Sequence, residues 1–128
     1  MELFRSTFLI RPENYAKAAA AIRKSGIVYE SLIEGAEDHR VIGTALNITG
    51  LFYSFADKGF TVLKCADWMP KERVDLMEQV FKAISKSVEP GTYIEFWDGD
   101  TIVRYDFLYD TVERCTAPHI LYAKREVI

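Results

Sequence analysis

The stretch 70–88 constrains the fold most, because its pattern is that of a long amphipathic helix. Apolar residues recur there at spacings of three and four, which places them on one helical face: Val74, Met77, Phe81, Ile84 and Val88. Pro70 suits the first turn, where its missing N–H is no loss, and the turn residues at 89–91 end the helix. At about 1.5 Å per residue such a helix is about 28 Å long, so a broad surface must cover its apolar face.

The segments on both sides of this helix are strand-like. Residues 3–10 predict a first strand, and its expected core face holds Phe4, Ser6, Phe8 and Ile10. A helix at about 12–24 follows and ends before Gly26. The other expected elements are a strand at 27–33, an extended segment bent at Gly43 within 40–48, hairpins at 51–56/60–65 and 92–97/101–108, and short strands at 111–115 and 119–124.

This order predicts a single α+β domain over residues 1–128. We expect a mainly antiparallel sheet with two helices, at about 12–24 and 70–88, packed on one face. Two strand–helix–strand units are typical of a split β-α-β arrangement, here elaborated by hairpins. The alternative is a strongly curved sheet wrapped around the long helix.

Charge and composition exclude several classes of partner. The net charge is −3 and no basic patch is present, so we expect neither nucleic acid nor a membrane surface as a partner. The acidity is concentrated in residues 91–128. No signal-peptide core or transmembrane run is present, which favours a cytoplasmic location. The two cysteines, Cys65 and Cys115, are expected to be small buried apolar groups.

The hairpin at 92–108 contains the most informative candidate site. A two-residue turn at its tip places Ile94, Phe96, Val103, Tyr105 and Phe107 on the face that would cover the long helix. With the turn at Gly99-Asp100, Glu95 stands opposite Arg104 and Tyr93 opposite Asp106. The other face then holds the candidate binding residues Tyr93, Glu95, Trp97, Arg104 and Asp106. Aromatic and arginine side chains dominate binding hot spots, although a solvated sheet face would have the same pattern.

The sequence contains no recognisable catalytic or metal-binding constellation. Asp98 and Asp100 flank a turn glycine, where turn chemistry alone explains them. The two histidines, His39 and His119, are eighty residues apart and have no metal-ligand spacing. We therefore expect no cofactor and no metal, and a non-enzymatic role is favoured.

The leading hypothesis is a small cytoplasmic protein-binding domain that uses its acidic, aromatic-bearing sheet face. An inhibitor or immunity-type protein that neutralises a basic partner would suit this charge distribution. A second hypothesis is a small-molecule-binding protein or enzyme with a pocket between helix and sheet, using Tyr93, Glu95, Arg104 and Asp106 or the histidines. A third is a self-associating structural domain that buries a sheet edge or the aromatic face in a homo-oligomer.

Overall fold

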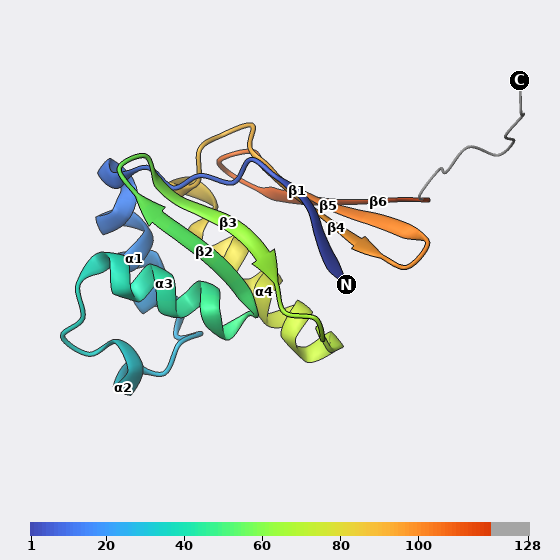
Figure 1. Ribbon diagram of the computed structural model, residues 1–128. Helices are drawn as coiled ribbons and strands as arrows, with labels where there is room; N and C mark the ends of the chain where they lie inside the picture. The colour runs from blue at the N-terminus through green and yellow to red at the C-terminus, as the bar shows by residue number, and fades with distance from the viewer. Residues whose placement is uncertain (119–128) are drawn as a thin grey trace, which may run out of the picture.

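The computed structural model describes residues 1–118, so the strand expected at 119–124 lies outside the described residues. Its helices are α1 (Tyr15–Ser25), α2 (Glu30–Ile33), α3 (Asp38–Ile48) and α4 (Lys71–Ile84) (Figure 1). Its strands are β1 (Glu2–Ser6), β2 (Leu51–Ala56), β3 (Gly59–Cys65), β4 (Tyr93–Asp98), β5 (Thr101–Phe107) and β6 (Val112–Pro118). The expected α+β class with antiparallel sheets is confirmed.

The strands form a four-stranded sheet in the order β1-β4-β5-β6 and a separate β2–β3 hairpin. In the β4–β5 hairpin Asp98 pairs with Thr101, which leaves Gly99-Asp100 as the two-residue turn. Glu95 consequently pairs with Arg104, and Tyr93 with Asp106. The register expected for this turn is therefore confirmed.

Helix α4 covers one face of the four-stranded sheet, which we call the inner face. The Phe81 ring lies 5.3 Å from the ring of Tyr105 and 5.2 Å from that of Phe107, centroid to centroid. Ile94 and Phe96 are fully buried on the same side. The strand parity expected for the hairpin is thus confirmed. The α-helix ends at Ile84, and its continuation tightens into a 3-10 turn at Ser85–Ser87.

The helix expected at about 12–24 is also present. A 3-10 turn at Pro12–Asn14 leads into α1, which ends at Gly26 in the left-handed conformation. Ala18 and Ala19 are fully buried, and α1 packs against α3 and α4. The small alanine side chains allow this close packing between helices.

Two predictions within 27–48 are wrong. No strand forms at 27–33, where the structure has the short helix α2, and the segment expected to be extended over 40–48 is α3. Four buried residues of α3 recur at helical spacing, Val41, Ile42, Ala45 and Leu46, and Gly43 is buried beside them. Gly43 is inside this helix because a Cβ atom there would collide with the Tyr53 side chain of β2. The glycine indicates close packing and not a bend.

The core face expected for the first strand is only partly correct. Phe8 and Ile10 are buried, but Phe4 is exposed. A β-bulge between Leu3 and Arg5 changes the alternation of the side chains. Leu3 therefore packs against the core, and Phe4 faces away from it.

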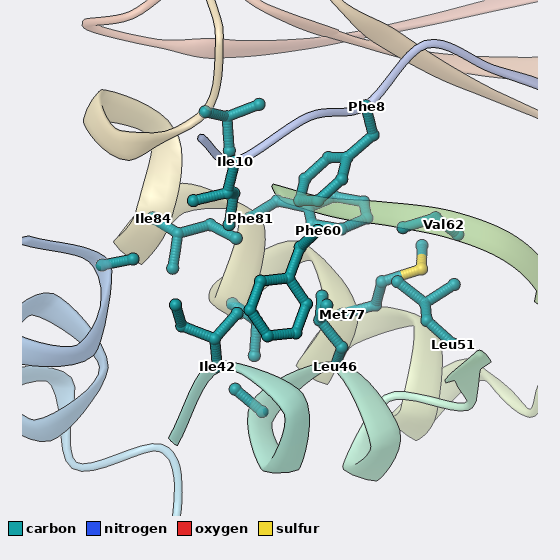
Figure 2. Packing of buried hydrophobic residues seen from close by; sticks show 14 of the residues in the cluster. Phe8, Ile10, Ile42, Leu46, Leu51, Phe60, Val62, Met77, Phe81 and Ile84 are labelled. Carbon is teal, nitrogen blue, oxygen red and sulfur yellow. The ribbon is translucent and has the colours of Figure 1, made fainter. Parts of the chain in front are cut away.

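The N-terminal segment connects the two sheets. After β1 pairs with β4, Ile10 forms an isolated bridge with Phe60 of β3, with backbone hydrogen bonds of 3.1 and 2.9 Å. Phe60 and Ile10 lie in the same core as Met77 and Phe81 of α4 (Figure 2). One continuous hydrophobic cluster therefore joins the hairpin, the helices and the four-stranded sheet.

Candidate functional site

The five candidate residues lie together on the outer face of the four-stranded sheet, which is the face opposite α4. The strand register arranges the side chains of this outer face in three rows. The first row runs across Glu2, Trp97, Ile102 and Ala117, the second across Arg5, Glu95, Arg104 and Cys115, and the third across Tyr93, Asp106 and Glu113. The structure thus brings Tyr93, Glu95, Trp97, Arg104 and Asp106 together.

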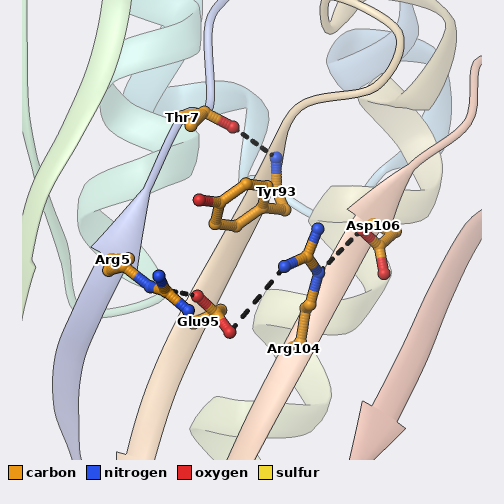
Figure 3. A network of polar contacts seen from close by, with 6 residues as sticks. All are labelled: Arg5, Thr7, Tyr93, Glu95, Arg104 and Asp106. Atoms are coloured by element: carbon orange, nitrogen blue, oxygen red, sulfur yellow. Dashed lines mark hydrogen bonds and ion pairs between the residues drawn. The ribbon is translucent and has the colours of Figure 1, made fainter.

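Glu95 is the centre of the polar network in the second row (Figure 3). Its side chain is only 7% exposed. Arg5 Nε donates a hydrogen bond of 2.7 Å to Glu95 Oε1, and Arg104 Nη1 lies 3.8 Å from Oε2. A buried carboxylate is costly unless it is paired, so the two flanking guanidinium groups allow Glu95 to be buried at this position.

Arg104 is held by both of its neighbours in the third row. Its Nε donates to Asp106 Oδ1 at 2.9 Å, and its guanidinium carbon lies 3.8 Å from the centroid of the Tyr93 ring. The hydrogen bond to Asp106 raises the pKa of Arg104 above its ordinary value. The Tyr93 backbone N–H donates to Thr7 Oγ1 at 2.8 Å, which fixes the strand that presents this ring. Arg104 is therefore held in a defined orientation.

Aromatic rings border the network at its other side. Phe4 and Trp97 pack edge to face, with 6.1 Å between ring centroids, and the Arg5 guanidinium carbon lies 5.1 Å from the Phe4 centroid. The Trp97 indole N–H donates to the Gly99 carbonyl. Both arginines of the second row thus lie against an aromatic ring, an arrangement that favours a guanidinium group.

Sequence reasoning did not include Arg5 and Phe4 in this site. Arg5 joins Glu95 only because β1 pairs with β4, a partner ninety residues away in the chain. Phe4 reaches the outer face only through the bulge. The alternation of residues 3–10 placed Arg5 on the face away from the core, but no local signal identifies its cross-strand partner.

A separate set of cavities lies between α4 and the inner face. One, of about 220 Å³, is lined by Glu78, Phe81, Lys82, Tyr105, Val112 and Arg114. Glu78 Oε2 accepts hydrogen bonds from the Tyr105 hydroxyl at 2.6 Å and from Arg114 Nη1 at 2.7 Å. Burial and then the bond to Glu78 raise the pKa of Tyr105 above its ordinary value. The polar groups of Glu78, Tyr105 and Arg114 are therefore hydrogen-bonded to one another.

The residues expected to line a helix–sheet pocket are elsewhere. Tyr93, Glu95, Arg104 and Asp106 are on the outer face, across the sheet from the cavities beside α4. His39 stacks on Phe55 with 5.0 Å between ring centroids, and His119 lies outside the described residues. Tyr93, Glu95, Arg104 and Asp106 therefore do not line these cavities.

Only one of the two cysteines is buried, although both were expected to be. Both are free thiols; Cys65 is buried, as expected, but Cys115 is exposed on the outer face. Burial raises the pKa of the Cys65 thiol.

In residues 1–118 no group of three His, Cys, Asp or Glu side chains could hold a metal ion. In the same residues no helix has the length and hydropathy needed to cross a bilayer.

Comparison with known proteins adds no relative to these observations. No protein-family model, no curated protein and no solved structure matches the chain.

Proposed function

We propose that this protein is a non-enzymatic protein-binding domain whose outer sheet face contacts a protein partner. The observation that supports the proposal is that Tyr93, Trp97 and Arg104 lie together over two adjacent strands, around charges that are already paired. Tyrosine, tryptophan and arginine are the residues that most often dominate the energy of protein interfaces. Side chains that are ordered before binding lose less conformational entropy when the complex forms.

The shape of the site also supports a protein partner. The three rows spread over β1, β4, β5 and β6, and the wide, open face of a sheet suits a protein surface better than a small ligand. An inhibitor or immunity-type role is one form that such a binding domain could take. We propose a cytoplasmic location, which suits a chain whose Cys115 thiol is free and exposed.

Affinity capture from the native cells tests the proposal. The bait is the whole chain, compared with the variant Trp97→Ala/Arg104→Ala and with a matched control, Trp68→Ala/Arg40→Ala. The control removes the same residue types at exposed positions away from the outer face. We expect proteins captured by the wild type to be lost from the first variant and kept by the control. The same proteins on both variants would contradict the proposal, once circular dichroism shows that each is folded.

Self-association is the alternative occupant of the same face. Light scattering at several concentrations distinguishes it, because a homo-oligomer formed through the outer face should dissociate in Trp97→Ala/Arg104→Ala. A monomer at every concentration, together with a captured partner, would favour a different protein as the occupant.

A further inference from the structure

The charge that the outer face presents to a partner differs from the charge of the residues that compose it. Arg5, Glu95, Arg104 and Asp106 sum to zero, but their exposure is unequal. The side chains of Arg5 and Arg104 are 60% and 35% exposed, whereas those of Glu95 and Asp106 are 7% and 25% exposed. Glu95 lies between the two guanidinium groups, and Asp106 lies beside Arg104 on the same strand. A partner therefore meets mainly positive charge at the centre of the outer face.

Both arginines keep hydrogen-bond donors for a partner. Arg5 bonds to Glu95 through Nε, and within residues 1–118 neither of its terminal nitrogens makes a hydrogen bond. Arg104 bonds to Asp106 through Nε, and its Nη1 lies 3.8 Å from Glu95. A guanidinium group has five N–H donors, so each can still bind a carboxylate with two parallel hydrogen bonds.

The arrangement also fixes a spacing between the two donors. Arg5 and Arg104 lie in one row on either side of β4, which is two strand separations or about 10 Å. Acidic residues at positions i and i+2 of an extended chain point to the same side and lie about 7 Å apart, and the long side chains of arginine and glutamate cover the remaining difference. The first row provides apolar contact next to them, at Trp97 and Ile102.

The margins of the face indicate which kind of anion fits. Glu2 is exposed at one end of the first row, and Glu113 at the end of the third. A long polyanion such as nucleic acid that crossed the face along the second row would pass beside Glu2 and Glu113, and their negative charges would repel it. A protein segment with two acidic residues between apolar ones would not be repelled in this way.

We infer that the partner binds through an acidic protein segment, with two carboxylates two residues apart on the same side of the segment received by Arg5 and Arg104 and an apolar side chain beside Trp97. The inference rests on the proposed function and specifies its partner. It also reverses the sign expected from composition, which suggested a basic partner. Arginine suits this role better than lysine, because its planar fork matches a carboxylate.

The test begins with a library of random twelve-residue peptides displayed on phage. Peptides are selected on the wild-type protein, and those that still bind Trp97→Ala are removed. We expect the remaining peptides to be enriched in Asp and Glu. Replacing Glu by Gln in a selected peptide should weaken binding at least tenfold in fluorescence anisotropy.

Three double variants locate the effect. Arg5→Gln/Arg104→Gln should weaken binding of the selected peptide at least tenfold, whereas Arg40→Gln/Lys58→Gln, which changes the net charge equally at exposed positions elsewhere, should not. Because the first variant leaves Glu95 buried without a cation, Arg5→Lys/Arg104→Lys is measured as well. It keeps both charges and should still lose severalfold affinity, since a bidentate contact is lost.

The outcomes separate the two proposals. Trp97-dependent peptides without acidic enrichment, or acidic peptides unaffected by Arg5→Gln/Arg104→Gln, would overturn the inference and leave the protein-binding function standing. An equal or higher affinity for a single-stranded DNA oligonucleotide than for the acidic peptide would also overturn it. If no Trp97-dependent peptide is selected, both the inference and the proposed binding face are wrong.

Discussion

At the scale of single residues, Tyr105 shows how a buried hydroxyl links stability to pH. Tyr105 is 2% exposed, and burial followed by the hydrogen bond to Glu78 raises its pKa in the folded protein. The unfolded chain ionises first, near the ordinary tyrosine value of about 10. The stabilisation is therefore complete below pH 10 and is lost as the pH rises above it, because the unfolded state then binds fewer protons.

We expect the variant Tyr105→Phe to be less stable than the wild type at pH 7, by about 1–3 kcal/mol for the lost bond to a charged group. Above pH 10 this difference should shrink by up to about 1.4 kcal/mol per pH unit. Urea unfolding of both proteins between pH 7 and 11.5 measures it. A constant difference over the whole range would show that Tyr105 is not the group responsible.

The sequence predicted only some of the residue pairs in the candidate site. Glu95, Arg104, Tyr93 and Asp106 could be paired because one short turn fixes their register. Arg5 could not be paired with Glu95, since the pairing of β1 with β4 depends on tertiary structure. Arg5 belongs to β1, the strand that joins the β4–β5 hairpin at its edge. The greater exposure of the two arginines relative to the carboxylates therefore depends on this pairing, and the sign of the accessible charge was not predictable from composition.

At the scale of elements, α4 and the β4–β5 hairpin were predictable because pattern and packing agree. The stripe on α4 buries Met77, Phe81 and Ile84, and the inner face of the hairpin buries Ile94, Phe96, Tyr105 and Phe107, as their periods indicate. Helix α3 was not, because it has a glycine in its middle. Gly43 lowers helix propensity, but α3 needs it where Tyr53 of β2 lies against the helix.

This contact predicts a reversal of sign. In an isolated helix Gly43→Ala would be stabilising by about 1 kcal/mol. Here the new Cβ would lie 2.7 Å from Tyr53 Cζ, so we expect the substitution to destabilise the protein. In a Tyr53→Ala background the space is free, and the same substitution should become stabilising. Thermal or urea unfolding of the four proteins in this double-mutant cycle measures the coupling; additive effects would contradict the assigned contact.

At the scale of the whole molecule, the bridge between Ile10 and Phe60 joins the β2–β3 hairpin to the four-stranded sheet through the N-terminal segment. Gly59 permits this bridge: its φ is +126°, and a Cβ atom there would lie 2.8 Å from the Ile10 carbonyl carbon and still closer to its oxygen. We expect Gly59→Ala to cost about 2 kcal/mol or more, from backbone strain and the collision together. Gly26→Ala is the matched control, since Gly26 also has a positive φ but has no atom within 4 Å of its Cβ position. It should cost only about 1 kcal/mol.

Hydrogen exchange then tests whether the two sheets unfold together. Because one hydrophobic cluster includes Phe60 and Val62 of the hairpin and Ile94 and Phe96 of the sheet, we expect Gly59→Ala to lower protection equally in β3 and β4. The amides of these two strands are compared in the variant, the Gly26→Ala control and the wild type. Equal loss in both strands means that opening the bridge requires opening the shared core. Loss confined to β2 and β3 would mean that the hairpin unfolds by itself, and the four-stranded sheet with α4 would then be sufficient to present the outer face.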